Sequence, residues 1–415
     1  MEKNYFGAIE FGSLFTTVVI VSYSKGRIDV VGNCKVRSNG FNNGYIINQE
    51  EFDSSLDEVI KEVYNKFKIK LNEVIVVLPN NAHKIYSATV DNRVLTERQI
   101  IGKQQVDSIR KQIKKAKVSD EEILVEEVPT YYVLDGDRYL RTAPINYQSS
   151  MLKIHSKIHT LPKDLVVSIK NSLDKKGIKI LEHYLNCSCA ATATSTNYEL
   201  ENECVSINIG QEVTTISAYN KLLLLKSTKI NFGVATLISY LAKELGVSED
   251  YAIELFESYF VCDVNYASDV IFNKELNLSE KRISGIILNR LYQAFDEIRS
   301  TCNYFISDLG FSNEHFYLVS GWLNDYEFFI EELGKYTALN LKYGNIDVLG
   351  LNSQAYANCY GALILFVNDN LDIIQKRLES EGNIEIESSN PNLSISDENK
   401  SSETTTTRFK DIFDD

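Results

Sequence analysis

Two copies of one strand-turn-strand pattern, each with a glycine at its turn, organise this sequence. In the first copy an apolar strand over residues 6–12 ends at a glycine, and a strand rich in β-branched residues follows over 14–23. The second copy places its strands over 204–210 and 214–219. Apolar runs bounded by glycine predict antiparallel strand pairs. A chain that opens each half in this way is expected to form two similar lobes.

Helical and buried-strand patterns surround both hairpins. Residues 51–67 and 165–176 place apolar side chains on one helical face, and the apolar run 74–78 stops at a proline. Strand pair, helix and buried strand in this order predict an α/β fold. In the second half we expect a third strand over 222–230, helices over 234–245, 249–256 and 280–309, and a buried strand over 316–319.

Residues 84–163 have a different texture, and an inserted α+β unit is expected there. A strand, a helix from about residue 96 to 117 and short alternating stretches follow one another. His155 and His159 lie in one such stretch, so we expect them on the surface of a strand rather than in a metal site. Cys187 and Cys189 are too closely spaced for a zinc or thioredoxin motif, and no metal site is predicted.

Composition excludes several classes of protein. A chain of 415 residues with 44% hydrophobic residues is expected to fold into more than one lobe. Its net charge of -14 argues against general nucleic-acid binding, because a polyanion requires a concentrated basic face. Seven cysteines are an odd set, and neither a signal-peptide core nor a run of about twenty apolar residues is present. These features predict a cytoplasmic protein with reduced thiols.

The C-terminal part changes composition twice. Residues 379–407 are rich in Ser, Asn, Thr and acidic side chains, which predicts a disordered linker. Residues 408–415 return to apolar character and predict a short amphipathic helix for a membrane interface. Three aspartates there oppose anionic lipid, so a frayed end or a partner-docking peptide remains an alternative. The expected membrane-binding residues are Arg408, Phe409, Lys410, Ile412 and Phe413.

The paired hairpins, together with the late motif Leu318-Val-Ser-Gly321, resemble the layout of actin-superfamily ATPases. Within that superfamily the sequence resembles FtsA, the bacterial division protein that ties FtsZ filaments to the membrane. The stretches that carry this resemblance are residues 38–48, 95–99, 122–136, 229–237 and 355–363. The position of the α+β unit, between the first hairpin and the second, is similar to FtsA and differs from MreB and actin.

The resemblance implies an actin-like (ribonuclease-H-like) two-lobed fold with an FtsA-type inserted α+β subdomain. It also implies boundaries. The core of lobe I is expected at 1–83 and 164–199, with 350–370 returning to it, the inserted subdomain at 84–163, the core of lobe II at 200–232 and 301–349, and an insertion in lobe II at 233–300.

In the resemblance the two hairpin turns hold the phosphates of ATP, and nearby carboxylates hold Mg²⁺ through water. Glu10, Gly12 and Ser13 stand where the family has Asp-x-Gly-Thr/Ser. Glu10 is one methylene longer than the aspartate that would organise magnesium-bound water. The first turn is therefore retained with an altered carboxylate.

The second turn departs further from the family pattern Asp-x-Gly-Gly-Gly-Thr-Thr-Asp. Only Gly210 and Thr214 match it clearly, and Asn208 lacks the charge that a magnesium shell requires. Gln211 and Glu212 add side chains where phosphate oxygens should meet bare backbone. If Glu212 points inward, its repulsion of a phosphate costs about 4 kcal/mol, or about a thousandfold in affinity.

The adenosine motif is also altered. Trp322 follows Gly321 where the family prefers a small residue, and Phe256 falls where the family often carries a lysine. ATP with Mg²⁺ is therefore a doubtful ligand, no catalytic residue is singled out, and weak or lost ATPase activity is expected.

By resemblance, the chain is expected to self-associate into filaments and to bind the C-terminal tail of FtsZ through residues 233–300. It would then lie on the inner face of the cell membrane at the division site. Two alternatives stay open: an active ATPase or sugar-kinase-like enzyme of the same superfamily, and a PilM-like scaffold of a surface-appendage machine.

Overall fold

The computed structural model describes most of the chain up to residue 374. The predicted linker at 379–407 and the predicted membrane segment at 408–415 lie outside the described residues and stay predictions. Within the described part, no helix combines the length and apolar character needed to cross a bilayer. The described residues are 4–24, 27–80, 82–92, 99–115, 119–312, 314–371 and 374.

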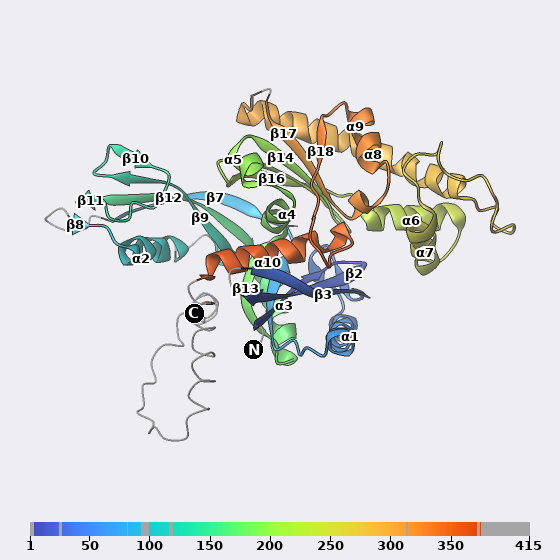
Figure 1. Cartoon of the computed structure of the whole chain (residues 1–415), viewed down its shortest axis with the longest axis horizontal. Coiled ribbons are helices and arrows are strands. Elements are labelled where there is room, and N and C mark those ends of the chain that lie inside the picture. The colour runs from blue at the N-terminus through green and yellow to red at the C-terminus, as the bar shows by residue number, and fades with distance from the viewer. Residues whose placement is uncertain are drawn as a thin grey trace, which may run out of the picture.

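One five-stranded sheet, with the helices around it, forms what we call lobe I (Figure 1). The strand order is β13-β6-β1-β2-β3, with β1 antiparallel to β2 and parallel to β6. The strands are β1 (Asn4–Phe11), β2 (Phe15–Ser24), β3 (Arg27–Arg37), β6 (Glu73–Leu78) and β13 (Lys179–Leu185), and the helices are α1 (Gln49–Phe67), α3 (Lys163–Lys175), α4 (Asn186–Thr194) and α10 (Ala357–Asp369).

A second five-stranded sheet and its helices form lobe II, and the sheet repeats the order of the first as β16-β15-β14-β17-β18. The expected duplication is therefore present. Its strands are β14 (Cys204–Ile209), β15 (Thr214–Asn220), β16 (Leu223–Ile230), β17 (Phe316–Gly321) and β18 (Leu341–Tyr343), and its helices are α5 (Asn197–Glu201), α6 (Val234–Leu245), α7 (Glu249–Tyr259), α8 (Glu280–Leu309), α9 (Phe329–Thr337) and η1 (Trp322–Asp325). A further short helix, η2 (Gln354–Tyr356), leads into α10.

Helix α8 shows how local sequence sets these elements. The Ser279 side chain accepts a hydrogen bond from the Arg282 N–H and caps its start, and Gly310 ends it at φ +63°. Its apolar face is buried in the core of lobe II with α6 and α7. The expected bounds 280–309 are confirmed.

The inserted unit is a four-stranded sheet, β10-β9-β12-β7, with α2 packed on it, and lies on the opposite side of the molecule from α6 and α7 (Figure 1). Its helix begins later than expected, at Lys103. Residues Gln99–Ile100 instead form a short strand paired with Gln148–Ser149. The other elements are β7 (Lys84–Asn92), α2 (Lys103–Lys114), β9 (Glu122–Leu134), β10 (Arg138–Leu140) and β12 (Leu152–Pro162).

The two histidines of β12 have different environments, which corrects one expectation. Both lie on a strand as predicted, but His159 is buried rather than on the surface. Its ring stacks on His83, with His83 Nε2 and His159 Nδ1 2.9 Å apart. Burial lowers the pKa of His83 to about 4 and that of His159 to about 3. The buried histidine has a hydrogen-bonding partner 76 residues away, which a local alternation pattern does not reveal.

Helices α10 and α4 pack in close contact because Gly361 has no side chain. A Cβ at this position would lie 1.9 Å from the carbonyl oxygen of Cys189. We predict that Gly361→Ala lowers the free energy of unfolding by about 1–3 kcal/mol, measured by urea denaturation. The matched control is Gly285→Ala in α8, where nothing lies within 4 Å, and a gain of about 1 kcal/mol is expected. An equal gain at both positions would contradict the close packing.

Candidate functional site

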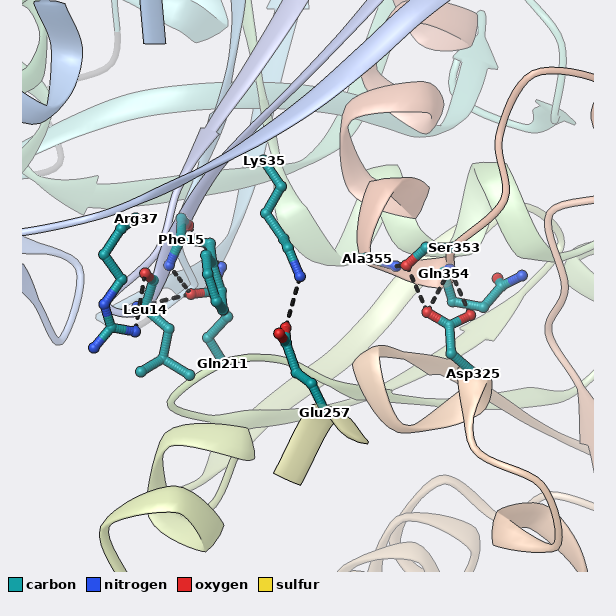
Figure 2. Close-up of polar contacts among 10 residues, drawn as sticks. All are labelled: Leu14, Phe15, Lys35, Arg37, Gln211, Glu257, Asp325, Ser353, Gln354 and Ala355. Atoms are coloured by element: carbon teal, nitrogen blue, oxygen red, sulfur yellow. Dashed lines mark hydrogen bonds and ion pairs between the residues drawn. The ribbon is translucent and has the colours of Figure 1, made fainter. Parts of the chain in front are cut away.

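The side chain of Gln211, which follows the second glycine turn's Gly210, reaches the backbone just after the first glycine turn (Figure 2). Its Oε1 accepts hydrogen bonds from the N–H groups of Leu14 and Phe15, both at 2.8 Å. Its Nε2 donates to the carbonyl oxygen of Phe15, also at 2.8 Å. A Cβ on Gly12 would lie 2.1 Å from this Nε2, so the glycine makes room for the amide.

This arrangement does not fit a nucleotide phosphate at the first turn. A phosphate in a glycine turn is bound by backbone N–H groups that face it. Here the N–H groups of Leu14 and Phe15 already donate to the amide of Gln211, which is buried. An amide suits the position because it accepts from two N–H groups and donates to a carbonyl at the same time.

Glu212 makes a separate contact with lobe I. Its Oε2 accepts a hydrogen bond from the Asn43 N–H at 2.6 Å, whereas the backbone N–H groups of Leu14 and Phe15 are bound by the amide of Gln211. Glu212 lines an open cavity of about 720 Å³, together with Tyr45 and Lys229. Burial raises the pKa of the Glu212 carboxyl, and the Asn43 amide, the Ser13 hydroxyl and Lys229 oppose that rise.

The two positions expected to hold magnesium are occupied by groups with little charge to offer. At the end of β1, Glu10 accepts a hydrogen bond from Asn358 at 2.7 Å, and burial raises its pKa to about 7. At the equivalent position of β14, Asn208 is buried and its Oδ1 accepts from the Ser320 hydroxyl at 3.4 Å. Mg²⁺ binds through charged oxygens and ordered water. The neutral amide of Asn208 supplies none of that charge, and Glu10 is the one carboxyl group of the two positions.

The remaining residues of the second turn serve the fold around it. Gly210 donates its N–H to the Val213 carbonyl oxygen at 3.0 Å, which closes the turn. Thr214 is buried, and its hydroxyl donates to the carbonyl oxygen of Phe232 at 2.9 Å. The hydroxyl of Thr214 is thus engaged with the segment that enters α6.

Aromatic side chains from both lobes meet where the adenosine motif was expected. Gly321 has φ +102°, and a Cβ there would lie 2.2 Å from the Ile209 carbonyl oxygen. Trp322 stacks on Phe15 of lobe I, with ring centroids 5.5 Å apart. Phe256 is buried in lobe II, 5.1 Å from the ring of Tyr326. The ring of Phe15 was not identified from sequence, because nothing local in the hairpin distinguishes it from other strand residues.

Two ion pairs connect β3 of lobe I with α7 of lobe II. Lys35 Nζ lies 2.8 Å from Glu257 Oε1, and Arg37 Nη2 lies 3.5 Å from Asp250 Oδ1. Lys35 also lies over the Phe15 ring, 4.4 Å from its centroid. These pairs join residues more than 200 positions apart, and sequence reasoning missed them for that reason.

The structure thus brings most of the predicted pocket residues to the two turns and places Phe256 in the core behind them. Among the residues that the structure describes, no group of three or more His, Cys, Asp or Glu side chains is arranged to hold a metal ion. The predicted membrane-binding residues 408–413 lie outside that part.

Comparison with known proteins shows which sequences this chain is similar to. No protein-family model matches the chain. FtsA of Staphylococcus epidermidis is 20% identical over 307 residues, which are 72% of this chain and 66% of that protein. FtsA of Streptococcus pneumoniae is 18% identical over 305 residues, which are 72% of this chain and 66% of that protein. FtsA of Bacillus subtilis is 22% identical over 215 residues, which are 51% of this chain and 48% of that protein. The chain resembles FtsA. It spans about two thirds or less of the length of these FtsA relatives.

Solved structures show the fold. One chain of a PilM–PilN type IV pilus biogenesis complex superimposes with a TM-score of 0.60 at 14% identity, over 86% of this chain and 97% of that one. The ethanolamine utilization protein EutJ of Carboxydothermus hydrogenoformans superimposes with a TM-score of 0.50 at 10% identity, over 87% of this chain and 90% of that one. The actin-like fold expected from the FtsA resemblance is confirmed.

The raised pKa of Glu10 predicts a pH-dependent stability. Because the folded protein holds this proton more tightly than the unfolded chain, its contribution is present below pH 4.5 and is lost as pH rises through about 7. Glu10→Gln should therefore raise the free energy of unfolding at pH 8 by about 1–3 kcal/mol and leave it nearly unchanged at pH 4.5. Urea denaturation at both pH values measures this.

The control for this prediction is Glu58→Gln, which changes an exposed carboxylate of α1 in the same lobe. It should leave the difference between the two pH values unaltered. An equal effect of Glu10→Gln at both pH values would show that its carboxyl titrates normally.

Proposed function

We propose that this chain is a cell division scaffold of the FtsA type. The observation that carries the proposal is its sequence similarity to FtsA proteins over as much as 72% of the chain. The inserted four-stranded sheet between the two hairpins supports it, because the FtsA resemblance places an α+β subdomain there. In this proposal the protein self-associates, binds the C-terminal tail of FtsZ and attaches it to the inner face of the cell membrane.

The proposed FtsZ-binding surface is the segment between α7 and α8, which projects from lobe II (Figure 1). It exposes four apolar side chains close together in sequence, an arrangement typical of a protein-binding surface. Stacked rings hold part of it in place, since Phe272 packs on Tyr259 with centroids 4.1 Å apart. The exposed residues are Tyr266, Val270, Ile271 and Phe272, with Val270 74% exposed.

Membrane attachment is proposed for residues 408–415. Burying the three apolar side chains Phe409, Ile412 and Phe413 yields at most about 5–8 kcal/mol, whereas ordering the segment costs about 1–2 kcal/mol per residue. One segment therefore binds weakly. A filament that presents many segments raises their effective concentration, so attachment would follow assembly.

A PilM-like assembly scaffold is the second candidate. The structural similarity to a chain of the PilM–PilN complex, over 97% of that chain, favours it. That likeness concerns the fold, whereas the sequence similarity points to FtsA. Direct binding to the FtsZ tail separates the two candidates.

We predict that the full chain binds a fluorescent peptide of the FtsZ C-terminal tail, measured by anisotropy. Val270→Asp should weaken binding by about tenfold or more, because a charge replaces an apolar contact. Leu349→Asp is the matched control, since Leu349 is also an exposed aliphatic residue, 95% exposed and in a different loop. Lack of binding by the unaltered chain would contradict the division proposal.

Membrane attachment predicts a second result. A fluorescent fusion that ends at Thr407 should lose membrane localisation in dividing cells, because it lacks Phe409, Ile412 and Phe413. Microscopy and membrane flotation measure the fraction bound. A fusion in which Asp414 and Asp415 alone are removed should remain bound. Equal attachment of the Thr407 truncation and the full chain would exclude these residues as the anchor.

A further inference from the structure

The cleft between the lobes is bridged by the protein's own side chains where an actin-like ATPase would place its nucleotide. We propose that Gln211, the Phe15–Trp322 ring pair and the ion pairs between β3 and α7 act together as an internal latch that holds the lobes closed without nucleotide. This goes beyond the scaffold function, because the protein's conformation would then no longer depend on ATP. Filament assembly would depend on protein concentration and on the membrane.

The first part of the latch is Gln211, which connects three elements. Its side chain binds the backbone of Leu14 and Phe15 in lobe I. Its carbonyl oxygen accepts from the N–H of Ala235 at 2.7 Å, in the first turn of α6. The start of α6 is therefore held to the second hairpin, and through Gln211 to the first. Lobe I, the hairpin of lobe II and α6 are linked through one residue.

The second part is a layer of rings and charges beside the turns. Phe15 stacks on Trp322, and Lys35 lies over both rings, 4.4 and 5.5 Å from their centroids. The ammonium group of Lys35 then reaches Glu257 on α7, as Figure 2 shows. Beside it, Arg37 contacts both the Leu14 carbonyl oxygen and Asp250. These contacts join the edge strand of lobe I to the helical part of lobe II.

Contacts outside the latch fix the segment that returns from lobe II to lobe I. Asp325 of η1 accepts hydrogen bonds from the Gln354 N–H at 2.8 Å and the Ser353 hydroxyl at 2.5 Å (Figure 2). Asn33 of β3 donates to the Gly350 carbonyl oxygen at 2.8 Å. The returning segment is thus held to both lobes, and opening of the cleft would have to break these bonds as well.

The test measures the distance between the lobes in the full chain. All seven native cysteines are buried, so spin labels can be attached selectively to cysteines introduced at Ser54 in α1 and Glu244 in α6, both of which are exposed. We expect pulsed electron resonance to give one narrow distance distribution, unchanged by saturating Mg-ATP. A broad distribution, or a shift to shorter distance with Mg-ATP, would overturn the proposal.

Latch variants supply the second comparison. Gln211→Ala combined with Trp322→Ala should shift the distribution to longer distances and broaden it, with circular dichroism reporting whether the protein is folded. Lys35→Glu changes a surface side chain, so it tests the latch even if the core variant fails to fold. It should broaden the distribution because it removes the ion pair with Glu257 and the contact with the Phe15 and Trp322 rings. Adding Glu257→Lys should narrow the distribution in part, because the charge swap restores only the ion pair.

The matched control is Lys226→Glu, which breaks the Lys226–Asp308 pair within lobe II. That pair has a similar length, 2.7 Å, and similar exposure. The Lys226→Glu variant should leave the interlobe distance unchanged. An unchanged distribution in both Gln211→Ala/Trp322→Ala and Lys35→Glu would refute the latch. Because this readout involves neither FtsZ nor membrane, its failure is distinguishable from failure of the division proposal.

Discussion

The hydrogen bonds between Gln211 and the backbone of the first hairpin connect the two lobes directly. Each contributes about 0.5–1.5 kcal/mol net when its partners are removed from water, and three are made by one buried side chain. The exposed pair Lys35–Glu257 is worth about 0–1 kcal/mol and is weakened by salt. The amide therefore outweighs the charges, and a carboxylate in its place would accept from the two N–H groups but could not donate to the Phe15 carbonyl.

The glycines of this cleft have explanations that do not involve phosphate. A side chain on Gly12 would collide with Gln211, and one on Gly321 with the backbone of Ile209. The close approach at Gly321 follows from the parallel pairing of β14 with β17, in which Gly321 lies opposite Ile209. These glycines are thus weak evidence for a bound nucleotide, because close packing within the protein already accounts for them.

Local pattern predicted the hairpins and several of the helices, including the full extent of α8 between Ser279 and Gly310. The family resemblance indicated that Gln211 and Glu212 add side chains at the second turn. It could not show that Gln211 binds the backbone of the first hairpin, because Leu14 and Phe15 lie 197 and 196 positions away. The buried His159 and the ion pairs of β3 were missed for the same reason. Periodicity reports which face of an element is apolar, whereas these partners are set by how distant elements pack.

The residues at the two expected carboxylate positions, Glu10 and Asn208, are consistent with lobes that are kept together by side chains rather than by a bound ligand. The resemblance described above implies acidic groups at the ends of β1 and β14, with Mg²⁺ to balance their charge. Without a cation, two acids at equivalent strand ends would repel each other and resist burial. The asparagine at position 208 removes one of these charges, and Asn358 supplies a hydrogen bond to Glu10, whose pKa of about 7 lets it lose part of its charge as well. The same residues that no longer suit magnesium therefore lower the electrostatic cost of closing the lobes without it.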